Sequence, residues 1–485
     1  MPAETASEPH GVLIAGSWRT AAEAFTRRDP SNPDRATGTY AAASAVEVEA
    51  AYDAAAVAAP RWGRRPAPER AEVLRRAADL LEARSASAAE RLTADIGKAI
   101  RDARAEVLRA VAILRYHAGE ALQADGETYP SSAADTMVIT TSEPVGVVCA
   151  ITPWNFPLAI PAWKLAPALS AGNPVVWKPA TAASGSAVLL AEILVEAGLP
   201  EGALNLLTGP GPELSEALTV DPRLAALSFT GSAQVGWGLQ AAVADRGVKV
   251  QLELGGKNPA IVLADADLPD AALQVASGAM GSTGQRCTAT SRVYVEDPVL
   301  ERFTELLLER VRELVVGDPF DEATDVGPVA SLEQLRSVGS YLDLAAAEPG
   351  VRVLAGGGRS EPGDGYWVDP TVLSDVPAES RLAREEIFGP VVILSPTSGY
   401  EAALEAANDT PFGLSAAIFT RDLGRAMSFA REIESGQVHI NRETAGAEPQ
   451  APFGGLKGSS NLQREQGKAA KRFFTNSKTV YVRAR

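Results

Sequence analysis

The sequence predicts an α/β protein of 485 residues built from two successive parallel-sheet units. Short β-branched runs alternate with Ala- and Leu-rich stretches of helical length, which indicates parallel strands joined by crossover helices. The composition, with 46% hydrophobic and 22% charged residues, is typical of an ordinary folded chain and not of a disordered or fibrous one. The length allows about three structural units and a large buried core.

The charge balance and the apolar pattern exclude several classes of function. The chain carries 45 Lys and Arg residues against 61 Asp and Glu residues, a net charge of −16, and such a surface repels nucleic-acid phosphates and anionic lipid. No apolar run approaches the roughly 20 residues of a membrane span, and Met1–Glu4 lacks the basic and apolar regions of a secretory signal. We expect a cytoplasmic protein without nucleic-acid or membrane partners.

Cysteine and histidine are scarce. With only Cys149 and Cys287 there is no disulfide framework, and a reducing compartment fits best. The three histidines lie far apart in the sequence, which argues against a metal site and obliges any catalytic triad to recruit a distant imidazole. Chemistry is therefore expected from carboxylates, amides or a lone thiol.

The first regular region, residues 46–124, is predicted to be helical. Ala, Leu, Glu and Arg dominate it, and apolar residues recur with helical spacing from Arg70 to Leu81. Such amphipathic helices pack against a larger body.

From Pro144 onwards the β-branched runs predict strands. These runs are 145–151, 174–177, 227–230, 248–254, 259–263, 292–295 and 391–394. The boundary between the two units is expected near Leu254–Gly256, because of where the motifs fall and not because of composition. Gly356–Gly358 and Glu361–Gly365 indicate a surface turn region. The alternating segment Lys478–Arg483 has no strand partner nearby in sequence, which suits it to close a sheet edge in another subunit.

Cys287 is the candidate nucleophile. It follows a glycine turn within the small-residue stretch Ser277–Ser291, which lets a substrate approach closely. A free cysteine is more often a small buried hydrophobe, and that interpretation is kept for Cys149 inside an apolar strand. A thiol that attacks a carbonyl group needs a base and a donor for the oxyanion.

Two residues at strand ends offer these groups. Glu253 precedes Gly255 and Gly256 at the carboxyl end of a predicted strand, where it can serve as a base, although most glutamates are merely solvated. Asn155 lies between two prolines and two aromatic residues, so its amide is either a preorganised donor or an ordinary turn asparagine.

Two further residues point to a phosphate or a ribose. Lys178 follows a predicted strand and is placed to reach such a group, although a lone lysine is most often a surface charge. Residues Phe229–Gly236 join a strand to a helix, so that Ser232 and the first helical amides face a pyrophosphate. The segment is not the G-x-G-x-x-G fingerprint.

Taken together, in this order and spacing, these segments resemble the NAD(P)-dependent aldehyde dehydrogenases over nearly the whole chain. The separation of 34 residues between Glu253 and Cys287 is similar to the family's usual value. Seven ordered motifs carry the resemblance: Pro153–Pro157, Gly172–Pro179, Phe229–Ser232, Glu253–Lys257, Gly284–Cys287, Glu385–Pro390 and Pro452–Gly455.

The resemblance implies a fold with three parts. A Rossmann-like nucleotide-binding domain would cover residues 1–122 and 144–254, and an α/β catalytic domain residues 255–461. A small β element for oligomerisation would be formed by residues 123–143 and 462–485. The family usually forms dimers or tetramers in this way, so Thr136–Thr140 and Thr479–Val482 are the expected pairing strands.

By this resemblance Cys287 would attack an aldehyde to form a thiohemiacetal, whose oxyanion is held by the Asn155 amide and the Cys287 backbone N–H. After hydride transfer to the nicotinamide, the thioester would be hydrolysed by a water that Glu253 activates. Lys178 would bind the adenosine ribose, Ser232 the pyrophosphate, and Glu386 with Phe388 the nicotinamide ribose and ring. No metal is expected. The full set of implied cofactor contacts is Thr152, Trp154, Lys178, Thr181, Gly211, Phe229, Ser232, Glu386 and Phe388.

Thr181 departs from the family's pattern. A glutamate that binds the ribose hydroxyls commonly stands three positions after the motif lysine, Lys178, and its carboxylate would repel a 2′-phosphate. A threonine does not repel it, and Lys178 supplies a counter-charge. We therefore predict that NADP is used at least as well as NAD.

The region His439–Ser460, with Arg464–Gly467 and the final strand, resembles the subgroup that oxidises 2-oxoglutarate semialdehyde. Arg286 would suit a substrate carboxylate, or would form a structural ion pair. The expected substrate contacts are Phe156, Trp163, Arg286 and Glu448. The alternatives are a short aliphatic or aromatic aldehyde, a CoA-acylating enzyme (which the presence of a base at position 253 disfavours), a cysteine hydrolase, and a non-catalytic binding protein on the same fold.

Overall fold

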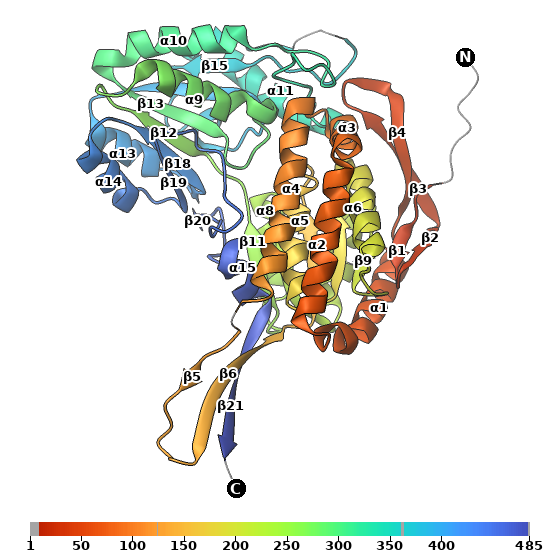
Figure 1. Ribbon diagram of the computed structural model, residues 1–485. Helices are drawn as coiled ribbons and strands as arrows, with labels where there is room; N and C mark the ends of the chain where they lie inside the picture. The colour runs from red at the N-terminus through yellow and green to blue at the C-terminus, as the bar shows by residue number, and fades with distance from the viewer. Residues whose placement is uncertain (1–8, 124, 360–362, 484–485) are drawn as a thin grey trace.

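The computed structural model describes residues 9–123, 125–359 and 363–483. Two seven-stranded sheets with helices around them make up most of the molecule, and a three-stranded sheet projects as an arm (Figure 1). The predicted helical region and the predicted alternation of strands and helices are confirmed. The expectations for Met1–Glu4 and for the turn at Glu361 and Pro362 lie outside the described residues. No described helix is long and apolar enough to cross a membrane.

The first sheet has the strand order β11-β10-β7-β8-β9-β1-β2. Strand β7 pairs in parallel with both β8 and β10, so the chain order reverses between β7 and β10. Open α/β sheets bind ligands outside the carboxyl ends of the strands at such a reversal. The strands are β1 (Val12–Ile14), β2 (Ser17–Arg19), β7 (Val147–Thr152), β8 (Val175–Pro179), β9 (Leu204–Leu206), β10 (Leu224–Thr230) and β11 (Lys249–Glu253).

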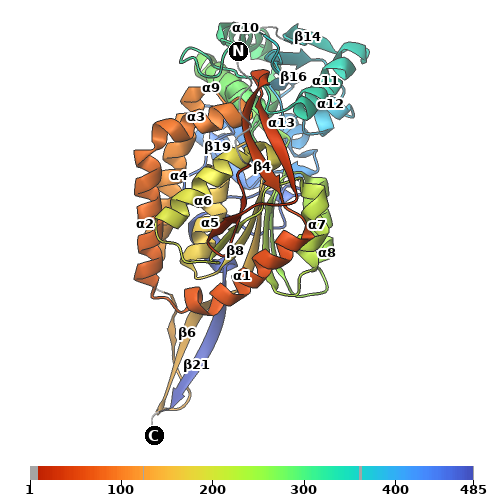
Figure 2. The ribbon, with the colours of Figure 1, turned by 90° about the vertical axis from the view of Figure 1, so that its right-hand side faces the viewer.

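Helices cover both faces of this sheet (Figure 2). Along β7, Val148 and Ala150 join the apolar cluster on one face, while Val147 and Cys149 join the cluster on the other, because strand side chains alternate. Cys149 is fully buried, as predicted. The first face packs against α2 (Ala67–Ala83), α3 (Ser85–Ile96), α4 (Ile100–Glu120), α5 (Ala159–Ser170) and α6 (Ser184–Glu196). The second packs against α1 (Ala45–Gly63), α7 (Gly211–Val220) and α8 (Ala233–Ala242).

The second sheet has the order β14-β15-β16-β13-β12-β18-β19. Its strands are β12 (Asn258–Val262), β13 (Thr290–Glu296), β14 (Arg352–Ala355), β15 (Thr371–Ser374), β16 (Val391–Thr397), β18 (Ser415–Phe419) and β19 (Gln437–Ile440). Its helices are α9 (Leu268–Met280), α10 (Leu300–Glu313), α11 (Leu332–Ala347), α13 (Tyr400–Asn408) and α14 (Leu423–Glu432).

Strand β11 of the first sheet runs almost directly into β12 of the second, through residues 254–257. The carboxyl end of one sheet therefore meets the amino end of the other. The predicted domain division at Leu254–Gly256 falls on this connection, and the division itself stays a prediction.

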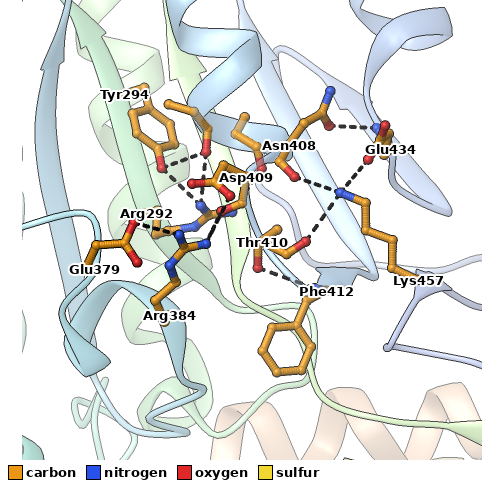
Figure 3. Close-up of polar contacts among 12 residues, drawn as sticks. Arg292, Tyr294, Glu379, Arg384, Asn408, Asp409, Thr410, Phe412, Glu434 and Lys457 are labelled. Carbon is orange, nitrogen blue, oxygen red and sulfur yellow. Dashed lines mark hydrogen bonds and ion pairs between the residues drawn. The ribbon is translucent and has the colours of Figure 1, made fainter.

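A polar cluster around the buried Arg292 holds the end of α13 against β13 and this connection (Figure 3). Arg292, only 4% exposed, donates hydrogen bonds to the carbonyls of Ala406 and Ala407 at 3.2 and 3.0 Å, and its Nε donates to the Lys257 carbonyl at 3.1 Å. Lys457 donates to the Asn408 carbonyl at 2.7 Å. The last carbonyls of a helix lack partners within the helix and carry partial negative charge, so these cations satisfy them.

The arm joins distant parts of the chain. Strand β21 (Thr475–Arg483) pairs antiparallel with β6 (Thr136–Pro144) over its whole length, and β5 (Thr128–Tyr129) extends the sheet. The expected pairing of this strand with another subunit stays a prediction, because no other described strand pairs with the outer edge of β21; within its own chain the strand pairs with β6. The reason is that α15 (Gly467–Phe473) returns the chain to the start of β7, where the Val145 N–H donates to the Phe474 carbonyl at 3.4 Å.

Candidate active site

The Cys287 loop lies just before β13, at the amino end of the second sheet. The turn before it is left-handed over Ser282, Thr283 and Gly284, with φ of 51°, 59° and 65°. Such a conformation costs free energy in a non-glycine residue, and side chains from other segments hold it here. Asp102 accepts hydrogen bonds from the Ser282 N–H and Oγ at 3.0 and 2.8 Å, and Thr283 Oγ1 donates to the Gly327 carbonyl at 3.0 Å.

Asn155 follows β7 and points at this loop. It is 4% exposed, and its Nδ2 donates to the Gln285 carbonyl at 2.9 Å, two residues before Cys287. An amide nitrogen carries two N–H donors, so the second remains for an oxyanion. The structure therefore brings the predicted amide and the predicted thiol together.

A buried ion pair supports the Asn155 loop from behind. Lys98 pairs with Glu106, donates to the Asn155 carbonyl at 2.8 Å, and places its ammonium 3.9 Å from the centre of the Phe156 ring. The Glu106 carboxylate also accepts the Leu158 N–H at 2.9 Å, at the start of α5. Reasoning from sequence missed both charged residues, because lysine and glutamate in a helical stretch are expected to face solvent.

Glu253, at the end of β11, is 2% exposed. Its Oε1 accepts a hydrogen bond from Ser460 Oγ at 3.2 Å, and its Oε2 has no partner among the described residues. Burial raises the pKa of this carboxyl well above its usual range, and the neighbouring Glu465 raises it further, against the opposing charges of Lys164 and Arg464. A raised pKa makes the carboxylate a stronger proton acceptor, which suits a general base.

The Cys287 thiol shares this electrostatic setting. Burial raises its pKa to about 12, and the carboxyl groups of Glu386 and Glu253 add to the shift. The structure thus places the predicted thiol and the predicted base close enough to influence each other's protonation. In this state the cysteine is a neutral thiol at neutral pH.

The predicted adenosine contacts lie at the carboxyl ends of β8 and β9: Lys178 is the last but one residue of β8, and Thr181 and Gly211 follow β8 and β9. Lys178 is 3% exposed, its Nζ donates to the Pro179 carbonyl at 2.9 Å, and it forms no ion pair with a described residue. Burial lowers the pKa of this ammonium to about 8. A Cβ on Gly211 would lie 3.7 Å from the Nζ atom, and Thr181 Oγ1 donates to the Gly209 carbonyl at 3.0 Å. A buried ammonium without an anionic partner fits a site for a polar ligand.

The predicted pyrophosphate contact, Ser232, is the N-cap of α8 and makes no capping hydrogen bond with its side chain. The first amides of α8 are thus free to bind an anion. A Cβ on Gly231 would lie 2.6 Å from the Phe229 ring, so any larger residue at this turn would have to displace that ring.

The predicted nicotinamide contacts come from the loop before β16. Glu386 accepts the Gly256 N–H at 3.0 Å, burial raises its pKa to about 7, and a Cβ on Gly255 would lie 2.1 Å from its Oε2. The rings of Trp154 and Phe388 meet edge to face at 5.4 Å.

Thr152 differs from the other implied cofactor contacts. Its hydroxyl already accepts the Trp177 Nε1–H at 2.9 Å. The remaining features, namely an unpartnered ammonium, an open helix N-terminus and glycines where a Cβ would collide, fit a dinucleotide. Among the described residues no group of His, Cys, Asp and Glu is arranged to hold a metal ion.

A cavity of about 240 Å³ opens beside Cys287. Of the expected substrate contacts, Phe156, Trp163 and Arg286 line it, whereas Glu448 is exposed and is not among its lining residues. Arg286 approaches Glu443 at 3.6 Å, as a structural ion pair requires, but its Nε has no partner among the described residues and is free for a substrate carboxylate. Both roles considered from the sequence are therefore open to it.

Reasoning from sequence missed the wall of this cavity that α4 provides. Asp102, Ala105, Glu106 and Arg109 line it at the positions i, i+3, i+4 and i+7 that share one face of a helix. The sequence did contain a signal for this wall: Asp102, Glu106 and Arg109 are charged residues on a helix face whose other residues pack inward.

Comparison with known proteins gives consistent matches over nearly the whole chain. The model of the Aldehyde dehydrogenase family matches residues 18–480. Alpha-ketoglutaric semialdehyde dehydrogenase of Bacillus subtilis (strain 168) is 45% identical over 476 residues, which cover 97% of each chain. The structure of betaine aldehyde dehydrogenase from Staphylococcus aureus in complex with NAD+ has a TM-score of 0.94 at 33% identity, covering 98% of this chain and 94% of that one. An NADP-dependent enzyme of E. coli has a TM-score of 0.94 at 37% identity, covering 98% of both chains.

Proposed function

The chain belongs to the aldehyde dehydrogenase family, as the seven sequence motifs predict, and we propose that Cys287 is its nucleophile and Glu253 its base. The observation that supports this proposal is the proximity of three groups: the thiol that lines the cavity, the Asn155 amide directed at its loop, and the buried Glu253 carboxyl, whose charge acts on the thiol. A thiol alone would be inert, but a thiol with a base and an oxyanion donor forms an acyl-transfer site.

In the proposed reaction, the thiol of Cys287 releases its proton to solvent and Sγ bonds to the aldehyde carbon, whose C=O π electrons move to the oxygen. The second N–H of the Asn155 amide and the Cys287 backbone N–H stabilise the oxyanion of the thiohemiacetal. When bound, NAD(P)+ accepts the hydride that leaves this carbon, which becomes a thioester. Glu253 then takes a proton from the water that attacks the thioester, the bond between carbon and sulfur breaks, and the acid leaves with the thiol restored.

We propose that Lys178, Ser232, Glu386 and Phe388 hold the dinucleotide and that Thr181 leaves room for a 2′-phosphate. The buried ammonium of Lys178 would then find an anionic partner. We expect kcat/KM with NADP to equal or exceed that with NAD. Steady-state kinetics with both nucleotides decides this, and a tenfold preference for NAD would overturn the proposal.

We propose 2-oxoglutarate semialdehyde as the substrate. The B. subtilis relative that carries this activity in its name supports it, as do the two arginines in the cavity wall and the small volume of the cavity. The proposal also includes a cytoplasmic location and a homodimer or homotetramer.

The experiment that tests the proposed function follows nicotinamide reduction by absorbance for the wild type and Cys287→Ala. The aldehydes are 2-oxoglutarate semialdehyde, succinic semialdehyde, hexanal and benzaldehyde, each with NAD and NADP. We expect the highest kcat/KM with 2-oxoglutarate semialdehyde and loss of all activity in the variant. A preference for hexanal or benzaldehyde would overturn the substrate, and full activity of the variant would overturn the nucleophile.

Product analysis with and without CoA separates this function from CoA acylation. Glu253 favours water as the acyl acceptor, because the base that activates it is present. Free acid is expected in both reactions, and formation of acyl-CoA would contradict the proposal.

A further inference from the structure

The charged residues that line the cavity differ in whether they have a partner of opposite charge or a set of hydrogen bonds. Asp102, Glu106, Arg109, Arg286 and Glu443 are the charged residues among those that line it. The Asp102 carboxylate accepts two hydrogen bonds from the Cys287 loop, and the Glu106 carboxylate accepts bonds from the start of α5 and from an ammonium. Arg286 and Glu443 face each other at 3.6 Å. Arg109 is the charged residue of this set that forms no ion pair and only one hydrogen bond with a described residue.

Arg109 lies in the middle of α4, and its side chain is largely removed from water. Its one hydrogen bond to a described residue runs from Nη2 to the Ala447 carbonyl, and no described carboxylate lies within ion-pair distance. Burial lowers the pKa of this guanidinium, and the nearby Glu448, Glu106 and Cys287 partly restore it. An arginine stays protonated under these conditions, so a fork with most of its N–H donors unused faces the cavity.

We propose that Arg109 binds the carboxylate of the substrate while the aldehyde group at the other end of the same molecule meets Cys287. This assignment rests on the proposed function and names the group that selects its substrate class, which is a short aldehyde with a terminal carboxylate. The planar fork of a guanidinium matches a carboxylate through two parallel hydrogen bonds. Phe156 and Trp163 supply apolar walls for the carbon chain between the two ends.

The size of the cavity agrees with a short substrate. Its volume of about 240 Å³ is below the roughly 300–1,000 Å³ of sites for drug-sized ligands. A long aliphatic or bulky aromatic aldehyde would also leave the Arg109 charge buried without a partner, which disfavours its binding.

Arg286 is a weaker candidate for the same task, although it lies beside the nucleophile. Its guanidinium is wedged against Gly281, where a Cβ would lie 1.8 Å from Nη2, and it faces the carboxylate of Glu443. To bind a substrate carboxylate it would have to give up that partner, whereas Arg109 has no ion pair to break.

The test compares Arg109→Met with the wild type on 2-oxoglutarate semialdehyde and on pentanal, an aldehyde with the same number of carbons and no carboxylate. We expect KM for the semialdehyde to rise by about 10-fold to 100-fold, with kcat little changed, as loss of a charge-assisted contact predicts. KM for pentanal should stay the same or fall. Arg109→Lys, which keeps the charge but loses the fork, should give an intermediate KM.

Arg104→Met is the matched control, because Arg104 lies on the same helix and pairs with Glu322 at 2.5 Å on the surface. It should behave as the wild type with both aldehydes. An unchanged KM for the semialdehyde in Arg109→Met, or an equal rise with pentanal, would overturn the role of Arg109. If Arg109→Met does not fold, the test uses Arg109→Lys. If the ratio of KM for the semialdehyde to KM for pentanal is the same in Arg109→Lys as in the wild type, the role of Arg109 is overturned.

A binding measurement separates this inference from the proposed function. Isothermal titration calorimetry with 2-oxoglutarate, the acid product and a dicarboxylate, needs no turnover. We expect at least about 10-fold weaker binding to Arg109→Met than to the wild type. If the wild type oxidises no aldehyde, the proposed function is overturned. The calorimetry then still tests whether Arg109 binds a carboxylate. Equal binding to both proteins would overturn Arg109 alone.

Discussion

At the scale of single residues, the site depends on groups whose protonation is shifted by burial. Cys287 is the clearest case, since its pKa is raised to about 12 by removal from water and by the neighbouring carboxyl groups of Glu386, Glu253 and Glu465. A thiol, and not a thiolate, is therefore the resting form without cofactor. The structure thereby predicts a slow nucleophile at neutral pH.

The alkylation rate of Cys287 by iodoacetamide tests this protonation state. The thiolate is the reacting form, and below the pKa its fraction grows tenfold per pH unit. In the cofactor-free enzyme the rate of inactivation should therefore rise about tenfold for each unit between pH 7 and pH 9. Cys287→Ala reports any labelling at Cys149. A rate that levels off by pH 9 would show an unshifted thiol.

Glu253 and Asn155 could be singled out from sequence because each lies near glycine or proline at the end of a β-branched run, and Cys287 because it follows a glycine turn among small residues. Arg109 and Lys98 could not, since a charged residue in a stretch predicted to be an amphipathic helix is expected to face water, and the structure places Lys98 in the connection between α3 and α4. Their surroundings come from distant segments, Asn155 and Phe156 for Lys98 and Ala447 for Arg109, and so depend on tertiary packing.

At the scale of elements, most strands could be predicted because parallel strands buried on both faces form continuous apolar runs. The hairpin of β3 (Glu23–Asp29) and β4 (Asn32–Ala42) could not, because most of β3 is exposed and lacks an apolar alternation. Its contacts come from distant parts of the sequence, such as α3.

The ion pair of Lys98 and Glu106 fixes the Asn155 loop against the start of α4. The variant Lys98→Met tests this role of the ion pair. The substitution leaves the Glu106 carboxylate buried without its cation, so we expect a loss of about 3–5 kcal/mol in the free energy of unfolding. We also expect a lower kcat/KM, because the Asn155 carbonyl loses its donor. Denaturant unfolding and kinetics measure the two effects.

Lys98→Met/Glu106→Gln is the informative control for that prediction. Glutamine keeps an acceptor for the Leu158 N–H without a buried charge, so the double variant should regain a large part of the stability. Equal stability of the single and double variants would show that the ion pair is not what holds the loop.

At the scale of the whole molecule, the projecting arm is the feature that lacks a partner. Tyr481 and Val482 on β21 are 72% and 45% exposed, and the outer edge of β21 pairs with no other described strand. Exposed apolar residues on an open sheet edge are a natural place for a second copy to pair.

Light scattering tests whether the arm pairs subunits. The mass of one chain is 50.6 kDa, and we expect twice or four times this value for the wild type. Tyr481→Glu should shift the mass toward that of the monomer, because it places a charge on the exposed face, while Arg104→Met should not. A monomeric wild type would contradict the proposed oligomer.

The central claim is that a thioester forms on Cys287 and that Glu253 is needed to hydrolyse it. The most direct measurement is a single-turnover experiment with Glu253→Gln, which keeps the shape of the side chain but cannot accept a proton. We predict a burst of about one NADPH per active site, a covalent acyl group on Cys287 by intact-protein mass spectrometry, and steady turnover reduced by about 10²-fold to 10⁴-fold. Steady turnover at the wild-type rate, or a burst without a covalent acyl group, would contradict the claim.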